Sequence, residues 1–280
     1  AGAHISDKVD LSKNFRPTWS YKDSQYYEPE NAQGRSAYYY TYNESNEGCN
    51  SAELNDACFD EVVVSSTSGP GLIDLNNDGE FTSADKDERQ NFANWYSYYR
   101  TRDYAAKAGV SRAFANLGEG IRIGYGRINK ATEDTVDGKK ITTIERGVRA
   151  FSGSDRKAFF DWLFAINPTL STPLRRALRA AGEYYENSSV IGPWSSTPGV
   201  MGGTHLSCRQ SYTILMTDGY WSDEGELRKT PIKNEDGVAG PTISGPDGAS
   251  YTYEAKSPFA DGFEETLADV AMYYWKRDLH

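Results

Sequence analysis

The amino-acid sequence predicts an α/β fold in which strands of a parallel or mostly parallel sheet alternate with helices. Two observations support this prediction. Stretches with the apolar spacing of amphipathic helices recur after residue 85, and shorter stretches with strand patterns lie between them. The first 85 residues lack this alternation and are rich in Tyr, Asn, Ser and Glu. We therefore expect an irregular segment over 1–85 and an α/β region over 86–280.

Helices are predicted where apolar side chains recur every three or four residues, and strands where apolar residues alternate or run together between turn residues. The predicted helices are 85–117, 154–167, 172–185 and 262–278, and the predicted strands are 61–66, 121–129, 143–151 and 211–219. An Asp-Gly pair at 137–138 predicts a hairpin or a short excursion before the strand at 143–151. A Gly- and Pro-rich excursion fills roughly 222–262.

The stretch SYTILMTDG (211–219) predicts a buried strand that ends in an acidic residue. Ligands of parallel α/β sheets bind beyond the carboxyl ends of the strands, which is where Asp218 would lie. Gly219 would let the chain turn at once. The alternative is that Asp218 and Gly219 form a simple turn.

The composition of the chain argues against several classes of function. The 280 residues carry a formal net charge of −10, which argues against nucleic acid as a partner and is compatible with bound cations. No run of eighteen apolar residues occurs, so no membrane span is expected in this chain. The N-terminal stretch AGAHISDKVD has no apolar region of the signal-peptide type, so no signal peptide is expected.

The stretch DLNNDGEFTSAD (74–85) has the spacing of a calcium-binding loop. Alternate oxygen-bearing side chains can wrap a hard cation, and Gly79 stands where such a loop turns sharply. The expected ligands are Asp74, Asn76, Asp78, the backbone carbonyl of Glu80, and Asp85. Asp in the last position resembles the dockerin form of this motif. The alternative is an Asn/Asp/Gly turn without metal.

The three cysteines predict one disulfide. Cys49 and Cys58 lie nine residues apart in one polar loop, and no CxxC pair or nearby histidine suggests zinc. We expect a Cys49–Cys58 bridge, with two reduced thiols as the alternative. Cys208 is left over, either as a buried thiol or as a partner for a cysteine outside this chain.

A second metal site is suggested by Thr172 and Asp218. A threonine hydroxyl at the start of a helix and a carboxylate at a strand end could together hold Mg²⁺, which keeps several waters and takes few protein ligands. The alternative is that Thr172 caps a helix and Asp218 lies in a turn, and spacing alone favours this alternative.

Four separated blocks of sequence are NFANWYSYYRTR, STPLRRALRAAGEYY, CRQSYTILMTDGYW and TLADVAMYYWKRDL. Together and in this order they resemble the N-terminal von Willebrand A region of the PilY1 family, the tip-located, adhesin-like factors of bacterial type IV pili. The resemblance covers roughly residues 90 to 280. It implies a Rossmann-like von Willebrand A-type domain. It also implies a metal-ion-dependent adhesion site in which Thr172 and Asp218 match two ligands.

The first part of that adhesion site, a D-x-S-x-S stretch after the first strand, has no match in this chain. The nearest string, DLSKN (10–14), follows no apolar strand. We therefore expect a fragment that lacks the first strand of the domain, with long loop insertions.

The resemblance implies an adhesion and type IV pilus biogenesis factor that binds through a cation and is not an enzyme. Its partners would be pilus components and a host or abiotic surface ligand, and its place would be extracellular, on the pilus of a Gram-negative bacterium. Two alternatives stay open: a secreted hydrolase stabilised by calcium, and an intracellular cation-dependent assembly module. Enzymatic signals are weak, because His4, His205 and His280 have no evident nucleophile partner beyond the sequence neighbour Cys208.

Overall fold

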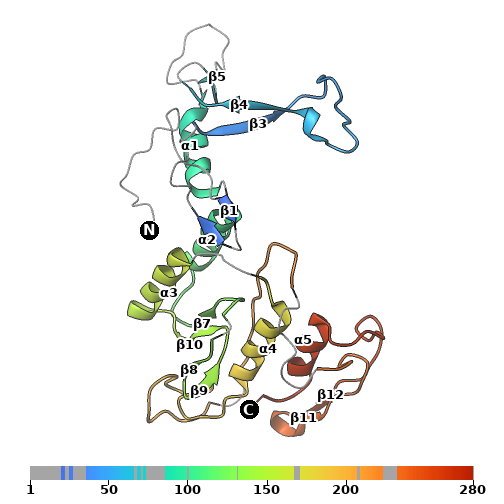
Figure 1. The fold of residues 1–280 in the computed structure, drawn as a ribbon. Coiled ribbons are helices and arrows are strands. Elements are labelled where there is room, and N and C mark those ends of the chain that lie inside the picture. Colours follow the sequence, from blue (N-terminus) through green and yellow to red (C-terminus); the bar gives the residue numbers. More distant parts are fainter. Residues whose placement is uncertain are drawn as a thin grey trace. The chain divides into compact units, whose positions relative to one another are not determined.

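A computed structural model of the chain describes most of its residues, in two compact units (Figure 1). One unit holds residues 1–115 with 163–168, and the other holds 116–162 with 169–280. The described residues are 20–22, 25–27, 36–65, 68–70, 72–73, 86–99, 101–130, 132–166, 171–206, 209–222 and 232–279.

The first unit combines short antiparallel strand pairs with two helices. Its elements are β1 (Ser20–Lys22), β2 (Gln25–Tyr27), β3 (Tyr38–Tyr42), a 3₁₀ turn η1 (Asp56–Cys58), β4 (Phe59–Val63), β5 (Leu72–Ile73), β6 (Lys86–Asp87), α1 (Glu88–Tyr99) and α2 (Arg102–Ala115). The strands pair as β1–β2, β3–β4 and β5–β6. The Tyr39 ring of β3 packs against Phe92 of α1 with ring centroids 5.1 Å apart, so this helix contacts one face of the β3–β4 hairpin.

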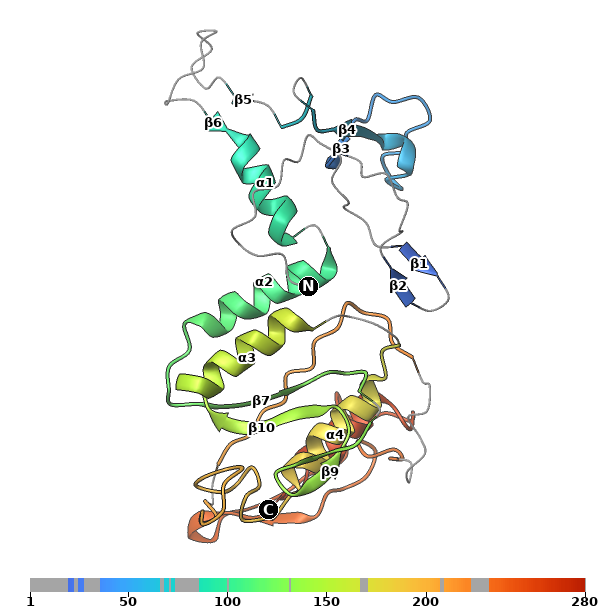
Figure 2. The ribbon, with the colours of Figure 1, turned by 60° about the vertical axis from the view of Figure 1, so that its left-hand side comes forward.

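The second unit contains the remaining elements. They are β7 (Arg122–Gly126), β8 (Asp134–Val136), β9 (Lys139–Ile141), β10 (Ile144–Ala150), most of α3 (Gly153–Ala165), α4 (Leu174–Tyr185), β11 (Thr242–Ser244), a 3₁₀ turn η2 (Pro246–Gly248), β12 (Ser250–Thr252) and α5 (Leu267–Trp275). β7 pairs with β10 (Figure 2). β8 pairs with β9, and β11 with β12. The predicted Asp-Gly hairpin is confirmed. Asp137 and Gly138, with φ of 48° and 81°, form its turn between β8 and β9.

The core of the second unit lies between its central strands and α4. Apolar side chains from β8, β9, β10 and α4 form one buried cluster: Val136, Ile141, Val148, Ala180 and Tyr184. A second group of rings joins β7 to α3, with Tyr125 4.5 Å from Trp162 and 5.6 Å from Phe159 between ring centroids. These two clusters explain why the amphipathic patterns at 154–167 and 172–185 predicted helices correctly.

Two predicted helices are wrong in their extent. The helix predicted over 85–117 is two helices, because the Thr101 hydroxyl accepts the Tyr104 N–H (3.2 Å) and starts a new helix. The last helix begins at Leu267 rather than 262, since Thr266 and Asp269 form a capping box there. Phe263, expected on its apolar face, precedes the helix and is 73% exposed.

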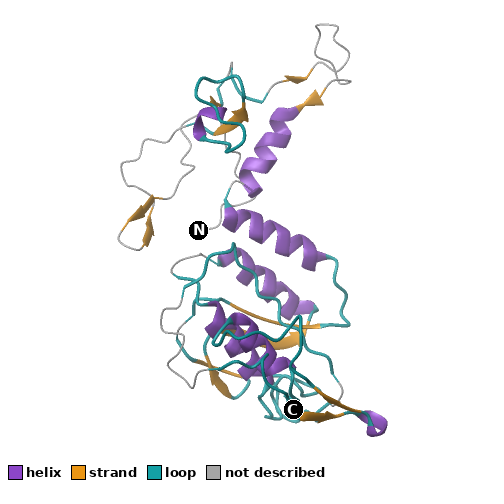
Figure 3. Cartoon of the chain, turned by 90° about the vertical axis from the view of Figure 1, so that its right-hand side faces the viewer, coloured by secondary structure: helices purple, strands orange, loops and turns teal. Residues whose placement is uncertain are grey.

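The predicted parallel sheet is not present in the described residues, where every sheet is two-stranded and antiparallel (Figure 3). Residues 211–217 are not a strand, and the apolar side chains of Tyr212, Ile214 and Met216 are 76%, 81% and 53% exposed. The prediction of a buried strand here is therefore wrong. A strand needs a backbone partner, and none is bonded to this segment within the described part of the chain. The mixed helix-and-strand architecture remains compatible with an α/β fold.

No helix of the described residues combines the length and the apolar character that crossing a bilayer requires.

Candidate functional site

Thr172 lies in the loop before α4, where two chain segments meet. Its N–H donates to the Ser222 hydroxyl (3.0 Å), and its carbonyl accepts the Ser222 N–H (3.0 Å). These two bonds hold the segment that follows Asp218 against the start of α4. Thr172 is not the helix cap, because the N-cap residue of α4 is Pro173 and no side chain accepts a hydrogen bond there. The capping alternative for Thr172 is therefore not supported.

The segment that follows β7 reaches the same loop. The Asn129 side-chain amide donates to the Ser171 carbonyl (2.6 Å) and lies 3.1 Å from the Ser171 hydroxyl. Arg176, in the first turn of α4, donates to the side-chain amide oxygen Oδ1 of Asn129 (3.3 Å). The end of β7, the loop at 171–173 and the segment around Ser222 thus converge at the start of α4.

Asp218 lies in a bend and is exposed. Gly219 has a φ of +125°, which only glycine adopts readily, and its N–H lies 3.4 Å from the Thr217 hydroxyl. An exposed carboxylate keeps its water, so this conformation imposes no desolvation cost that a cation would have to offset. Within the described ranges, no group of three or more His, Cys, Asp or Glu side chains is placed to hold a metal ion.

Arg175, in the first turn of α4, also contacts the segment around Ser222. Its guanidinium lies 5.2 Å from the Trp221 ring centroid, and it also donates to the Glu265 carbonyl. Arg175 is buried, so these contacts tie the start of α4 to Trp221 and to the residues that precede α5.

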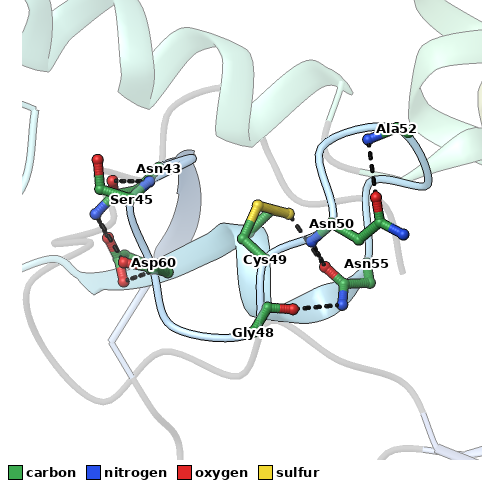
Figure 4. The surroundings of a disulfide bond; sticks show 10 residues. Asn43, Ser45, Gly48, Cys49, Asn50, Ala52, Asn55 and Asp60 are labelled. Carbon is green, nitrogen blue, oxygen red and sulfur yellow. Dashed lines mark hydrogen bonds between the residues drawn. A yellow bond between two sulfur atoms is a disulfide. The ribbon is translucent and has the colours of Figure 1, made fainter.

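The predicted Cys49–Cys58 disulfide is confirmed, at the tip of the β3–β4 hairpin (Figure 4). The side-chain amides of Asn43 and Asn46 donate to the Asp60 carboxylate (3.0 and 2.9 Å). These hydrogen bonds lower the pKa of Asp60, which keeps it charged. The bridge and the amide contacts together give the tip a defined structure.

The other predicted site residues lie outside the described part of the chain. These are the ligands at 74–85, together with Cys208, His4 and His280. The residues that flank the loop are described: Ile73 pairs with Lys86 and Leu72 with Asp87, and α1 begins at Glu88. His205 forms an isolated β-bridge with Ser195.

A buried charged cluster surrounds Asp137, and no sequence motif marks it. The Arg149 guanidinium donates to both Asp137 carboxylate oxygens (3.0 and 2.5 Å), and the Tyr184 hydroxyl donates to Oδ2 (2.7 Å). The Val148 N–H in turn donates to the Tyr184 hydroxyl oxygen (2.8 Å). Burial and the neighbouring Asp137 charge raise the pKa of Tyr184. Burial opposes the charge on Arg149, but its hydrogen bond and ion pair with Asp137 outweigh this effect and raise the Arg149 pKa.

Fold and contacts define a disulfide-bonded protein of mixed helix and strand, with three segments converging at the start of α4. The chain is similar to the type IV pilus biogenesis factor PilY1 of Pseudomonas aeruginosa. Identity is 33% over 276 residues with strain PAO1, 33% over 274 with strain PAK and 30% over 271 with strain UCBPP-PA14. These alignments cover 97–98% of this chain and 20–21% of the relatives, so the chain spans about a fifth of their length.

The chain belongs to the PilY1 family, as its four sequence blocks predicted. No family model matches it, and no solved structure gives a significant match.

Proposed function

We propose that the chain is part of a type IV pilus biogenesis factor that acts in adhesion on the outside of a Gram-negative cell. Three relatives that bear this name, similar along nearly the whole chain, support the proposal. Its partners would be pilus components and a surface ligand. The Cys49–Cys58 disulfide fits an oxidising compartment and counts against the intracellular alternative. The relatives are named for pilus biogenesis, so the hydrolase alternative gains no support.

Adhesion would depend on a cation held by Thr172 and Asp218. The observation that carries this proposal is the pair of hydrogen bonds between Thr172 and Ser222, which brings the segment after Asp218 to the start of α4. A neutral hydroxyl and one carboxylate suit Mg²⁺, which keeps waters and an open position. That open position would accept a carboxylate from the partner surface.

We further propose a von Willebrand A-type sheet that is completed by a strand beside β7. Arg122, at the start of β7, donates to the carbonyls of Ser195 and Ser196 (2.6 and 2.8 Å), and the Leu206 N–H donates to the Trp194 carbonyl (2.9 Å). The segment after Leu206 therefore starts near the start of β7. The end of β7 and the segment around Ser222 both reach the loop before α4. β7 and the segment after Leu206 therefore run in the same direction. An added parallel strand between them would pair with both.

The loop at 74–85 would bind Ca²⁺ through Asp74, Asn76, Asp78, the Glu80 carbonyl and Asp85. Pairing of β5 with β6 supports this proposal, because it closes the two ends of the twelve-residue motif. Binding would order the loop and support the start of α1.

The adhesion site is tested by Asp218→Ala and Thr172→Val in the full-length protein, with pilus number held constant. We expect cation-dependent surface attachment to fall at least ~10-fold, since each change removes a ligand from a site with few protein ligands. Asp161→Ala, which removes an exposed carboxylate from α3, is the matched control. Attachment that is unchanged, with metal still bound, would show that Asp218 is a turn residue.

The calcium loop is tested separately by calorimetry on the 280-residue chain. Asp74→Ala with Asp78→Ala should abolish calcium uptake, while Asp161→Ala should leave it intact. Equal uptake by the two variants would rule out the loop as the binding site.

A further inference from the structure

The β3–β4 hairpin presents an exposed aromatic face with a carboxylate among the rings. In an antiparallel pair, directly opposite residues lie on the same face. The register places Tyr38 opposite Val63, Tyr40 opposite Glu61 and Tyr42 opposite Phe59. Edge-to-face contacts join Tyr38 to Tyr40 (5.8 Å) and Tyr42 to Phe59 (5.9 Å). The Tyr40 hydroxyl donates to the Glu61 carboxylate (3.0 Å).

The aromatic face and the face that contacts α1 are opposite faces of the hairpin. The opposite face carries Tyr39, which contacts Phe92 of α1, and that contact accounts for one aromatic side chain of β3. On the aromatic face, Tyr40 and Tyr42 are 57% and 48% exposed, and Phe59 and Val63 are also exposed. Adjacent large apolar groups on a surface are typical of an interaction site.

The charge around this face selects the class of partner. Residues 36–65 contain six carboxylates and no Lys, Arg or His. They are Glu44, Glu47, Glu53, Asp56, Asp60 and Glu61. Tyrosine rings attract cations over their faces, and a guanidinium can stack on a ring while it pairs with a carboxylate.

The hairpin is also built to hold this face in one geometry. The Cys49–Cys58 disulfide closes its tip, and the Asn43 N–H donates to the Cys58 carbonyl (2.8 Å), which extends the ladder to the bridge (Figure 4). At the other end the Val64 N–H donates to the Ala37 carbonyl (2.8 Å). A preformed surface loses little conformational entropy on binding.

We propose that the aromatic face of the β3–β4 hairpin docks an arginine-rich segment of a protein partner. An arginine lies over the Tyr40 and Tyr42 rings and pairs with Glu61. This interaction is independent of the proposed cation site at Thr172 and Asp218.

The test is fluorescence anisotropy of the 280-residue chain with a labelled Arg-Gly repeat peptide at low salt. We expect binding that Tyr42→Ala and Glu61→Gln each weaken about two- to five-fold, the range for one exposed cation–π contact or ion pair. Glu53→Gln is the matched control, because it removes the same charge from the exposed tip loop. It should change affinity by no more than about 1.5-fold. Peptide mapping of the Cys49–Cys58 bridge confirms that each variant has folded.

Three outcomes would overturn the proposal. Equal losses for Glu53→Gln and Glu61→Gln would mean that bulk charge alone attracts the peptide. A Ser-Gly repeat peptide that binds as tightly would mean that the face recognises no cation. Sedimentation that shows a dimer disrupted by Tyr42→Ala would mean that the face binds a second copy of this chain. If Tyr42→Ala fails to fold, the Glu61→Gln variant alone tests the proposal, because it removes a charge without changing the packing of the hairpin.

Discussion

Replacing Arg149 with methionine should destabilise the second unit, residues 116–162 with 169–280, far more than the same change at Arg146 in the same strand. Arg149 makes a two-pronged ion pair with Asp137, whose side chain is only 2% exposed. Methionine keeps the apolar stem but removes the cation, so the Asp137 carboxylate stays buried with Tyr184 as its remaining side-chain donor. Arg146 pairs with Asp155 in an ion pair whose side chains are 46% and 33% exposed.

The difference in burial sets the magnitudes. Removing one partner of a buried ion pair costs about 3–5 kcal/mol, because it leaves an uncompensated charge. An exposed pair contributes about 0–1 kcal/mol, since water screens both charges. We therefore expect Arg149→Met to lower the free energy of unfolding by about 2–5 kcal/mol more than Arg146→Met does.

Urea denaturation measures the cost, and hydrogen exchange of the β8–β10 amides shows where it falls. The chain has two units, so urea unfolding can combine two transitions. Hydrogen exchange therefore gives the cleaner value of the free energy lost by the second unit. The double variant Asp137→Asn with Arg149→Met should recover at least ~1 kcal/mol, since no buried charge remains. Asparagine tolerates the positive φ of 48° at this turn. Equal costs for the two arginine variants, or an additive double variant, would refute the reasoning.

Three further predictions follow from the same unit. A Cβ at Gly182 would lie 2.4 Å from the Tyr274 ring, so Gly182→Ala should destabilise the α4–α5 contact by about 1–3 kcal/mol in urea titrations despite its better helix propensity. The raised pKa of Tyr184 means that the unfolded state loses this proton first. The stability that the protonated Tyr184 contributes is therefore complete below pH ~10 and falls as the pH rises further. Tyr184→Phe should make the free energy of unfolding less dependent on pH in this alkaline range. Asp269 accepts the Thr266 N–H and hydroxyl (2.9 and 2.8 Å). Asp269→Ala should therefore cost about 2–4 kcal/mol by thermal melting, against about 1 kcal/mol for Thr266→Ala.

Local sequence patterns correctly predicted the helices, strands and turns whose signal lies within their own residues. The helices at 153–165 and 174–185, the strands at 122–126 and 144–150, and the hairpin turn at Asp137 are confirmed. In each case the signal lies within a few residues: helical spacing of apolar groups, strand alternation, or an Asp-Gly pair. The disulfide belongs to the same group, because its two cysteines share one short loop.

Contacts between distant segments could not be predicted in this way. The pairing of Asp137 with Arg149 and Tyr184 joins a turn, a strand and a helix, and no local pattern of charge or spacing marks it. The strand β3 was missed for a similar reason. Its run of tyrosines has strand propensity, but only the register with β4 separates a packed face from an exposed one.

The segment at 211–217 has the composition of a strand, but no backbone hydrogen bond pairs it with another segment among the described residues. Its row of apolar side chains, Tyr212, Ile214 and Met216, is exposed, and adjacent exposed apolar groups are typical of an interaction site. If the proposed parallel strand inserts beside it, the row becomes buried and Asp218 moves from water towards a crevice. The carboxylate would then carry a desolvation cost that a cation offsets. Sheet completion and cation binding at Asp218 would therefore be coupled, so the isolated chain should bind Mg²⁺ at this site weakly or not at all.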